Sequence, residues 1–182
     1  DNLAWDRAAD LLTESDFYRF EHRLIFGAIA ALVQAGKPAD VITVFERLQS
    51  LGKADDCGGL AYLNALAQSV PSAANMRRYA EIVRERAILR KLIAVDLLIV
   101  DDFCLDVMDA TESRDAHELL RERHRSGSMI ITSNRGPDEW LAMFADPVRA
   151  QSAIDRFTSN SYDLVIDGES YRRRQRPGID AT

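Results

Sequence analysis

The sequence predicts an α+β protein in which an all-α helical bundle, residues 1–94, precedes an incomplete α/β segment, residues 95–182. Apolar residues recur at helical spacing up to residue 94, and no alternating strand pattern occurs there. After residue 95, short apolar runs alternate with helical patterns, which is typical of a parallel sheet. Because residues 1–94 hold equal numbers of acidic and basic side chains, the formal net charge of −6 belongs entirely to the second part.

The first helices of the bundle are predicted from apolar stripes and from residues that begin or end helices. Two stripes at helical spacing comprise Trp5, Ala8, Ala9 and Leu12, and then Phe20, Leu24, Ala28 and Leu32. Gly36 ends the second of these helices. Asp40 suits the N-cap of the next helix, residues 41–51, which Gly52 closes.

Gly58 and Gly59 precede a short helix, and Pro71 and Ser72 open the longest one, which is expected to end near Ile93. The buried side of this longest helix is predicted to comprise Met76, Tyr79, Ile82, Val83, Leu89 and Leu92. For its arginine-rich side, a solvated face and a partner-docking face are both open interpretations. The aromatic residues near the start of the chain are predicted to be core rather than a stacking platform for bases: Trp5, Phe17, Tyr18 and Phe20.

The second part begins with a buried strand. Leu97–Val100 is a continuous apolar run that ends abruptly in Asp101 and Asp102, as expected of a parallel strand covered on both faces. No Gly, Pro or Ser linker separates Arg90 from Asp101, although domain boundaries usually fall in such linkers. The junction therefore has the character of a splice between two segments of different origin.

Two further strands and their helices complete the predicted α/β segment. A helix that stops at Gly127 leads to a second apolar strand, residues 129–131, which ends in Thr132, Ser133 and Asn134. Pro137 and Pro147 each suit the first turn of a helix. Residues 162–166 are predicted to form a third strand.

Composition argues against several classes of protein. No apolar run approaches the roughly 20 residues that cross a bilayer, and the N-terminus lacks a basic stretch followed by an apolar core, so a cytoplasmic protein is expected. Cys57 and Cys104 have neither the number nor the spacing for a disulfide framework or a zinc site, and are expected to be free and buried. A pI near 5.1 argues against broad nonspecific adhesion to DNA phosphates.

Four segments of the first part carry a family resemblance: DFYRFEHRLIF at 16–26, GKPAD at 36–40, GGLAYL at 58–63 and PSAANMRRYAEIVRERAILRKL at 71–92. Through them, residues 2–93 resemble the N-terminal domain of the bacterial replicative DNA helicase DnaB. The resemblance implies a helical interaction module without catalytic chemistry, which assembles into the collar of a hexameric helicase and contacts primase and the helicase loader. The family's bundle normally ends in a helical hairpin, whose second helix is missing here.

Four segments of the second part carry another resemblance: LLIVDDF at 97–103, IITSNRGPDEW at 130–140, AIDRF at 153–157 and GESYR at 168–172. Residues 96–176 thereby resemble the C-terminal half of the IstB-type AAA+ ATPases, helpers of insertion-sequence transposition that are similar to the helicase loader DnaC. The resemblance implies ATP and Mg²⁺ as cofactors. It assigns Asp101 and Asp102 to Mg²⁺ and water, Asn134 to sensing the γ-phosphate, and Arg156 to a neighbouring subunit's nucleotide. Cys104 stands where that family commonly has glycine.

The phosphate-binding loop of such ATPases, GxxxxGK[ST], is absent from the sequence. No lysine follows Lys91, and the pairs Gly36-Lys37 and Gly52-Lys53 do not stand between a strand and a helix. The resemblance therefore implies an incomplete P-loop NTPase fragment whose parallel sheet lacks its P-loop strand. Catalysis by this chain alone is not expected, although both parent families are ATP-dependent.

Two other groups of residues are weaker candidates for binding. The densest basic cluster comprises Arg172, Arg173, Arg174 and Arg176, for which nucleic-acid binding and a solvated tail are the alternatives. His117 and His124 lie seven residues apart on one helix, but no third ligand is spaced for a metal site, so exposed histidines are expected.

Two functional hypotheses follow. The preferred one is a replication-related protein-interaction module, whose partners are replicative helicase subunits, primase or a helicase loader, fused to the incomplete AAA+ fragment. The alternative is an ATP-binding helper protein of insertion-sequence transposition or helicase loading. DNA is a weak candidate partner, a homo-oligomer is a candidate assembly, and no membrane partner is expected. A third interpretation is a rearranged reading frame without an evolved function.

Overall fold

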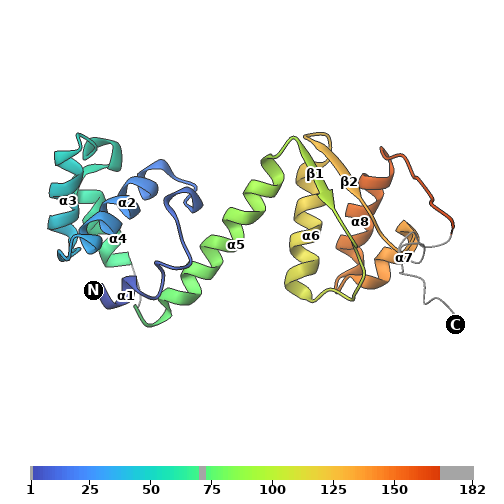
Figure 1. Cartoon of the computed structure of the whole chain (residues 1–182), viewed down its shortest axis with the longest axis horizontal. Helices are drawn as coiled ribbons and strands as arrows, with labels where there is room; N and C mark the ends of the chain where they lie inside the picture. Colours follow the sequence, from blue (N-terminus) through green and yellow to red (C-terminus); the bar gives the residue numbers. More distant parts are fainter. Residues whose placement is uncertain (1, 70–72, 169–182) are drawn as a thin grey trace, which may run out of the picture. The chain divides into compact units, whose positions relative to one another are not determined.

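The computed structural model of the protein describes residues 2–69 and 73–168 (Figure 1). By packing, it divides into two compact units, residues 1–101 with 125–132, and residues 102–124 with 133–182. The predicted domain boundary between residues 94 and 95 was placed where the sequence pattern changes. It differs from the division into packing units and stays a prediction.

The first unit is mainly helical, as predicted. Its α-helices are α1 (Asn2–Trp5), α2 (Phe20–Gln34), α3 (Val41–Ser50), α4 (Gly59–Ser69) and α5 (Met76–Ala94). Short 3₁₀ turns separate some of them: η1 (Glu14–Asp16), η2 (Asp55–Cys57) and η3 (Ala73–Asn75). The predicted helix through Leu12 is wrong in length, because α1 ends at Trp5 and isolated turns follow it. Pro71 and Ser72, predicted to open the longest helix, lie outside the described residues.

The ends of α2 and α3 follow from their sequence signals. The Asp40 carboxylate accepts hydrogen bonds from the backbone N–H groups of Ile42 and Thr43, both at 2.9 Å, and so caps α3. Gly36 and Gly52 take the left-handed backbone conformation, with φ of 67° and 66°. Each glycine and the lysine after it donate backbone hydrogen bonds to carbonyls of the last helical turn, which terminates the helix.

The core of the first unit lies between α2, α3 and α4. Its buried members are Ala28, Leu32, Val44, Leu48, Cys57 and Leu63. A smaller cluster joins Ala8 and Leu12 to Ala80 of α5, with Phe17, Phe26, Met76 and Val83 packed against it. Both cysteines are free and buried, as predicted.

Helix α5 buries only part of the predicted side. Leu89 is buried and Met76 and Val83 pack against the core as predicted. The other three predicted residues are exposed, namely Tyr79, Ile82 and Leu92, and Ala80 and Ala87 are buried in addition. Helical spacing alone could not set the limits of the buried side, because the contacts of α5 with Ala8 and Leu12 depend on tertiary packing. Tyr18 and Phe20, predicted to be core, are also exposed, while Phe17 packs against Phe26 with ring centroids 4.9 Å apart.

The strands β1 (Leu97–Val100) and β2 (Ser128–Ile131) form a parallel two-stranded sheet in which Leu97 pairs with Ser128 and Val100 with Ile131. One face of this sheet is exposed, with Leu97 49%, Ile99 61% and Ile130 49% accessible. The expectation of a strand covered on both faces is therefore wrong. Alternate residues of a strand point to opposite faces, and only the face of Leu98 is covered.

The second unit contains α6 (Ala110–Arg123), α7 (Pro137–Trp140), the 3₁₀ turn η4 (Leu141–Met143) and α8 (Pro147–Thr158). Pro137 and Pro147 open their helices as predicted. Helix α6 packs beside α8 (Figure 1), and the buried residues here include Leu120, Trp140, Phe144, Ala150, Ala153 and Ile154.

The predicted third strand, residues 162–166, is wrong. The segment makes no strand pairing, and its apolar side chains are 80–103% exposed. A strand needs the backbone of a neighbour for its hydrogen bonds, and the described sheet contains only β1 and β2.

Candidate functional site

The residues that follow the two strands meet at the carboxyl end of the sheet. Asp101 follows β1 and Thr132 follows β2, and the Thr132 hydroxyl donates a hydrogen bond to the Asp101 carboxylate. The backbone N–H of Thr132 also donates to the carbonyl of Val100 at 2.9 Å, which extends the parallel pairing by one residue. The exposed Asp101 carboxylate is thus held at the carboxyl end of the sheet, where α/β proteins commonly place their ligand sites.

The chain turns sharply in the second unit at Asp102–Leu105. Asp102 and Cys104 have φ of 53° and 58°, a left-handed conformation that is unfavourable for residues other than glycine. The backbone N–H of Leu105 donates to the Asp102 carbonyl at 3.2 Å. The Cys104 side chain is buried, and burial raises the pKa of its thiol to about 11, so it stays protonated and unreactive near neutral pH.

Ser133 fixes the loop after β2. Its hydroxyl donates to the Phe103 carbonyl at 2.7 Å and accepts from the Trp140 indole N–H at 3.1 Å. Phe103 stacks edge-on against Trp140, with ring centroids 5.0 Å apart. The Arg135 guanidinium adds a bond from Nε to the Cys104 carbonyl at 3.1 Å. These contacts join the segments after the two strands.

Asn134 and Arg156, the other predicted catalytic residues, are both exposed in the second unit. Arg156 lies on α8 beside an open groove of about 640 Å³, whose lining includes Leu141, Val148 and Asp155. Within residues 2–69 and 73–168, no hydrogen bond or ion pair joins Asn134 to Arg156. The basic cluster Arg172, Arg173, Arg174 and Arg176 lies outside the described residues.

The residues present fit a Mg²⁺–nucleotide site only in part. Carboxylates at a strand end suit Mg²⁺, which prefers oxygen ligands and a shared phosphate. Within residues 2–69 and 73–168, however, no three His, Cys, Asp or Glu side chains gather as metal ligands. Gly36-Lys37 and Gly52-Lys53, the two Gly-Lys pairs, are helix ends, so neither forms a phosphate cradle.

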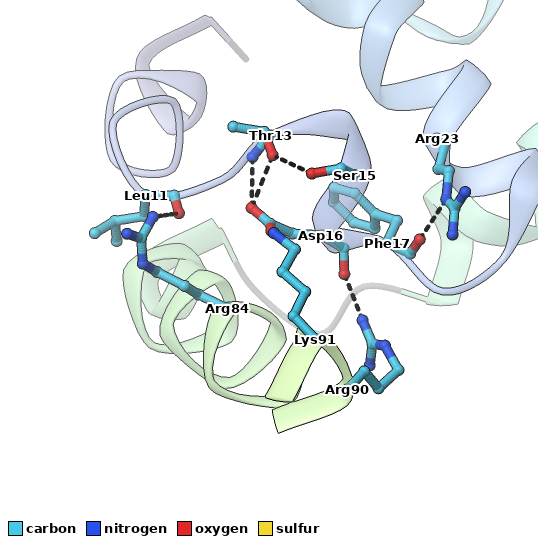
Figure 2. Close-up of polar contacts among 9 residues, drawn as sticks. All are labelled: Leu11, Thr13, Ser15, Asp16, Phe17, Arg23, Arg84, Arg90 and Lys91. Atoms are coloured by element: carbon cyan, nitrogen blue, oxygen red, sulfur yellow. Dashed lines mark hydrogen bonds and ion pairs between the residues drawn. The ribbon is translucent and has the colours of Figure 1, made fainter. Parts of the chain in front are cut away.

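A polar cluster in the first unit attaches residues 11–17 to α5 (Figure 2). Asp16 is 5% exposed, and its carboxylate accepts from the Lys91 ammonium at 2.8 Å and from the Thr13 backbone N–H at 2.8 Å. Burial acts to raise the pKa of Asp16, but the hydrogen bonds from Lys91 and Thr13 and the charge of Lys91 outweigh it. The pKa is therefore held below its ordinary value of 3.8.

Two arginines of α5 support the same attachment (Figure 2). Arg90 donates to the Asp16 carbonyl at 2.6 Å, and Arg84 donates to the Leu11 carbonyl at 2.7 Å. From α2, Arg23 donates to the Phe17 carbonyl at 2.7 Å. Arg84 and Arg90, on the arginine-rich side of α5, thus form hydrogen bonds within the first unit. Neither interpretation of this side, as a solvated face or as a partner-docking face, included such bonds.

Sequence reasoning missed Asp16 and Lys91 as a pair. The available signal was the spacing of Thr13 and Asp16, which resembles a helix-capping pattern, and the single lysine within an arginine-rich helix. Their separation of 75 residues is visible only after folding.

Part of α5 remains exposed and apolar. Ile88 and Leu92 lie one helical turn apart, and both are exposed, at 46% and 36%. No helix in the described ranges is long and apolar enough to cross a membrane. Exposed apolar side chains on a helix of this kind are suited to contact with another protein.

Comparison with known proteins finds relatives that fit each part of the chain. Residues 1–85 match the family model described as DnaB-like helicase N terminal domain. The replicative DNA helicase DnaB of Haemophilus influenzae is 34% identical over 164 residues, which cover 88% of this chain and 34% of that protein. Rv3427c of Mycobacterium tuberculosis, an insertion-sequence protein whose name gives ATP binding as its expected activity, is 42% identical over 83 residues. That match covers 45% of this chain and 33% of Rv3427c, and it fits the resemblance of the second part to IstB-type proteins.

The chain therefore spans about a third of the length of these two relatives. The crystal structure of the N-terminal domain of DnaB helicase from Mycobacterium tuberculosis matches with a TM-score of 0.50 and 40% identity, covering 51% of this chain and 67% of that one. Together with the match of residues 1–85, this likeness shows that the chain belongs, through its helical part, to the family of DnaB-like helicase N-terminal domains.

Proposed function

We propose that this chain is a protein-interaction module of DNA replication, in which the helical residues 1–94 bind subunits of the replicative helicase, primase or a helicase loader. Residues 95–182 are an AAA+ fragment without catalysis of its own. The observation that carries the proposal is the family membership of the helical part, supported by 40% identity to a solved helicase N-terminal domain.

The contacts within the helical part support a binding role. The Asp16–Lys91 ion pair and the Arg90 hydrogen bond hold α5 against residues 11–17. The exposed Ile88 and Leu92 side chains therefore project from an anchored helix. A helix that is already held in place loses little backbone conformational entropy on binding, which favours association with an apolar groove or helix.

The proposal is tested by immobilising the full chain and measuring binding of purified replicative helicase, primase and helicase loader by interferometry. We expect one or more of these proteins to bind, and Ile88→Glu to weaken binding about tenfold or more, because it places a charge in the apolar contact. Val148→Glu is the matched control, since Val148 is an exposed apolar residue of the other unit. Absence of binding by all three proteins would rule out the proposal.

A second candidate function is ATP binding, as in a helper of insertion-sequence transposition or helicase loading. It is favoured by the likeness to Rv3427c and by the Asp101 carboxylate held at the carboxyl end of β1 through Thr132. The absent phosphate loop and the lack of any lysine after Lys91 oppose it.

Titration calorimetry of the full chain with Mg-ATP decides this second candidate. Binding that weakens in Asp101→Asn, and not in the nearby exposed control Asp106→Asn, would support it. Heat no larger than dilution would eliminate it, and would leave the interaction module unaffected.

A further inference from the structure

An exposed aromatic side chain in the helical unit has arginines around it, just before the start of α2. Tyr18 is 76% exposed, and Phe20, two residues further along, is 53% exposed. Sequence reasoning favoured core over a stacking platform for bases at these positions, whereas the structure places both rings in contact with solvent. An exposed aromatic ring offers a flat surface on which another planar group can stack.

The backbone that carries the Tyr18 ring is anchored. The Arg23 guanidinium donates from Nε to the Phe17 carbonyl at 2.7 Å and from Nη2 to the Tyr18 carbonyl at 3.4 Å (Figure 2). Phe17 packs in turn against Phe26 of α2, with ring centroids 4.9 Å apart. Because this backbone is already ordered, a ligand that stacks on the ring loses little affinity to further ordering of the protein.

Arg90 of α5 covers one face of the same ring. Its guanidinium carbon lies 5.7 Å from the centre of the Tyr18 ring, which is a cation–π contact. Arg90 also donates to the Asp16 carbonyl at 2.6 Å, and this bond holds the guanidinium beside the ring (Figure 2). Since Tyr18 remains 76% exposed with Arg90 in place, the surface of the ring away from Arg90 is open to solvent.

The charges beside Tyr18 favour a polyanion as the ligand. Arg19, Arg23 and Arg90 contribute positive charges, and the Glu21 carboxylate, 3.9 Å from the Arg19 guanidinium, offsets part of this charge. The Arg19 side chain remains 58% exposed. Arginines next to an open aromatic ring are a common means of binding single-stranded nucleic acid, because phosphates pair with the guanidinium groups while bases stack on the ring.

We propose that Tyr18, with Arg19, Arg23 and Arg90, binds a single-stranded polynucleotide, one base of which stacks on the open face of the Tyr18 ring. A single strand is favoured over a duplex, because duplex bases stack on one another and present only their edges in the grooves. Every base has a face that can stack, so the site tolerates changes of sequence. DNA and RNA share this chemistry.

This surface is distinct from the apolar one proposed for replication proteins. Residue 90 lies on the opposite side of α5 from Ile88 and Leu92, because residues two apart in an α-helix are about 200° apart around its axis. Ile88→Glu should therefore leave binding of a single strand unchanged. Failure of either proposal leaves the other standing.

The test titrates the full chain into a fluorescently labelled oligothymidylate of about 12 nucleotides and follows the anisotropy at low ionic strength. We expect binding, and Tyr18→Ala to raise the Kd about tenfold, as the loss of one stacked base predicts. Tyr18→Phe keeps the ring and should bind like the unchanged chain. Tyr162→Ala is the matched control, because Tyr162 is a fully exposed tyrosine of the other unit, at 103%. Neither alanine substitution should alter the circular dichroism spectrum, since both side chains are exposed.

A salt series tests the phosphate contacts. Arg19 and Arg149 form a matched pair, because both side chains are 58% exposed and each lies within 4 Å of one carboxylate. Arg19→Gln should reduce the dependence of log Kd on log salt concentration by about one, whereas Arg149→Gln should leave it unchanged.

Changing the probe separates stacking from charge. An abasic strand of the same length, which keeps the phosphates, and a duplex should both bind about tenfold more weakly than oligothymidylate, and polyglutamate should not compete. Oligouridylate in a parallel titration shows whether DNA or RNA is preferred. The proposal is overturned if oligothymidylate does not bind, if Tyr18→Ala and Tyr162→Ala bind it alike, or if the abasic strand, the duplex or polyglutamate binds as well as oligothymidylate does. Equal binding of polyglutamate would instead indicate a surface for an acidic protein segment.

Discussion

At the scale of single residues, the buried Asp16 links residues 11–17 to α5 and is expected to stabilise the helical unit. Its carboxylate is buried and accepts hydrogen bonds from Lys91 and Thr13. The neutral amide oxygen of an asparagine would accept weaker hydrogen bonds from the same two groups. We predict that Asp16→Asn lowers the free energy of unfolding by about 2 kcal/mol, the range for a hydrogen bond to a charged group. Urea unfolding at neutral pH measures the loss, and Asp10→Asn, an exposed carboxylate nearby, is the control.

The same substitution should change the response to acid. Because the folded-state pKa of Asp16 is held below 3.8, its contribution is fully present above that value and is lost as the pH falls through the folded pKa. The difference in stability between the unchanged chain and Asp16→Asn should therefore shrink as the pH falls below about 4. A difference that stays constant down to low pH would contradict the assigned ion pair.

Cys104 provides a second prediction, because its φ of 58° favours glycine. Alanine at this position keeps the unfavourable Cβ, whereas glycine removes it, so Cys104→Gly should be more stable than Cys104→Ala by about 1 kcal/mol. At most positions the order is the reverse, since glycine makes the unfolded chain more flexible. Urea unfolding of the two variants compares them directly, and a more stable alanine variant would refute the backbone explanation.

At the scale of elements, α6 depends on a cap that the sequence makes recognisable. The Asp109 carboxylate accepts from the backbone N–H groups of Thr111 and Glu112 at 2.7 and 2.8 Å, and Glu112 accepts in return from the Asp109 N–H. We predict that Asp109→Ala costs about 1 kcal/mol of stability. Asp106→Ala, an exposed acidic residue outside the helix, should cost much less in the same unfolding measurement.

The helices and strands also show how much of the fold could be predicted from the sequence. Helices with local end signals, such as the Asp40 cap and the Gly36 terminator, were predicted nearly to the residue. The buried side of α5 was predicted only in part, because its limits depend on packing against residues that are distant in sequence, such as Ala8 and Leu12. The third strand failed for a related reason: residues 162–166 have the local pattern of a strand but no pairing partner.

The candidate site was predictable to a similar degree. The sequence located Asp101 at the end of β1, and the structure adds Thr132 as its hydrogen-bond partner. The role of Ser133 in joining the Phe103 carbonyl to the Trp140 indole depends on tertiary packing, and no spacing in the sequence indicates it.

At the scale of the whole molecule, the two packing units should differ in their response to mild acid. Burial lowers the pKa of His117 in the second unit below its ordinary 6.5, and the charges of Arg121, Arg149 and Arg156 lower it further. A histidine with a lowered folded-state pKa costs stability as the pH falls through 6.5, because the unfolded chain binds the proton first. The contribution of Asp16 to the first unit does not change over this pH range, because its folded-state pKa lies below 3.8.

Calorimetry of the full chain is therefore expected to resolve two transitions, one for each unit. Only the transition of the second unit, which contains His117, should move to lower temperature when the pH falls from about 7.5 to about 5.5. His117→Gln should make that transition insensitive to pH over this range, and Asp16→Asn should lower the temperature of the other transition at both pH values. If the two units unfold independently, a substitution in one unit leaves the transition of the other unchanged. A single transition that both substitutions shift would therefore show that the helical unit and the unit containing α6 and α8 unfold as one cooperative body.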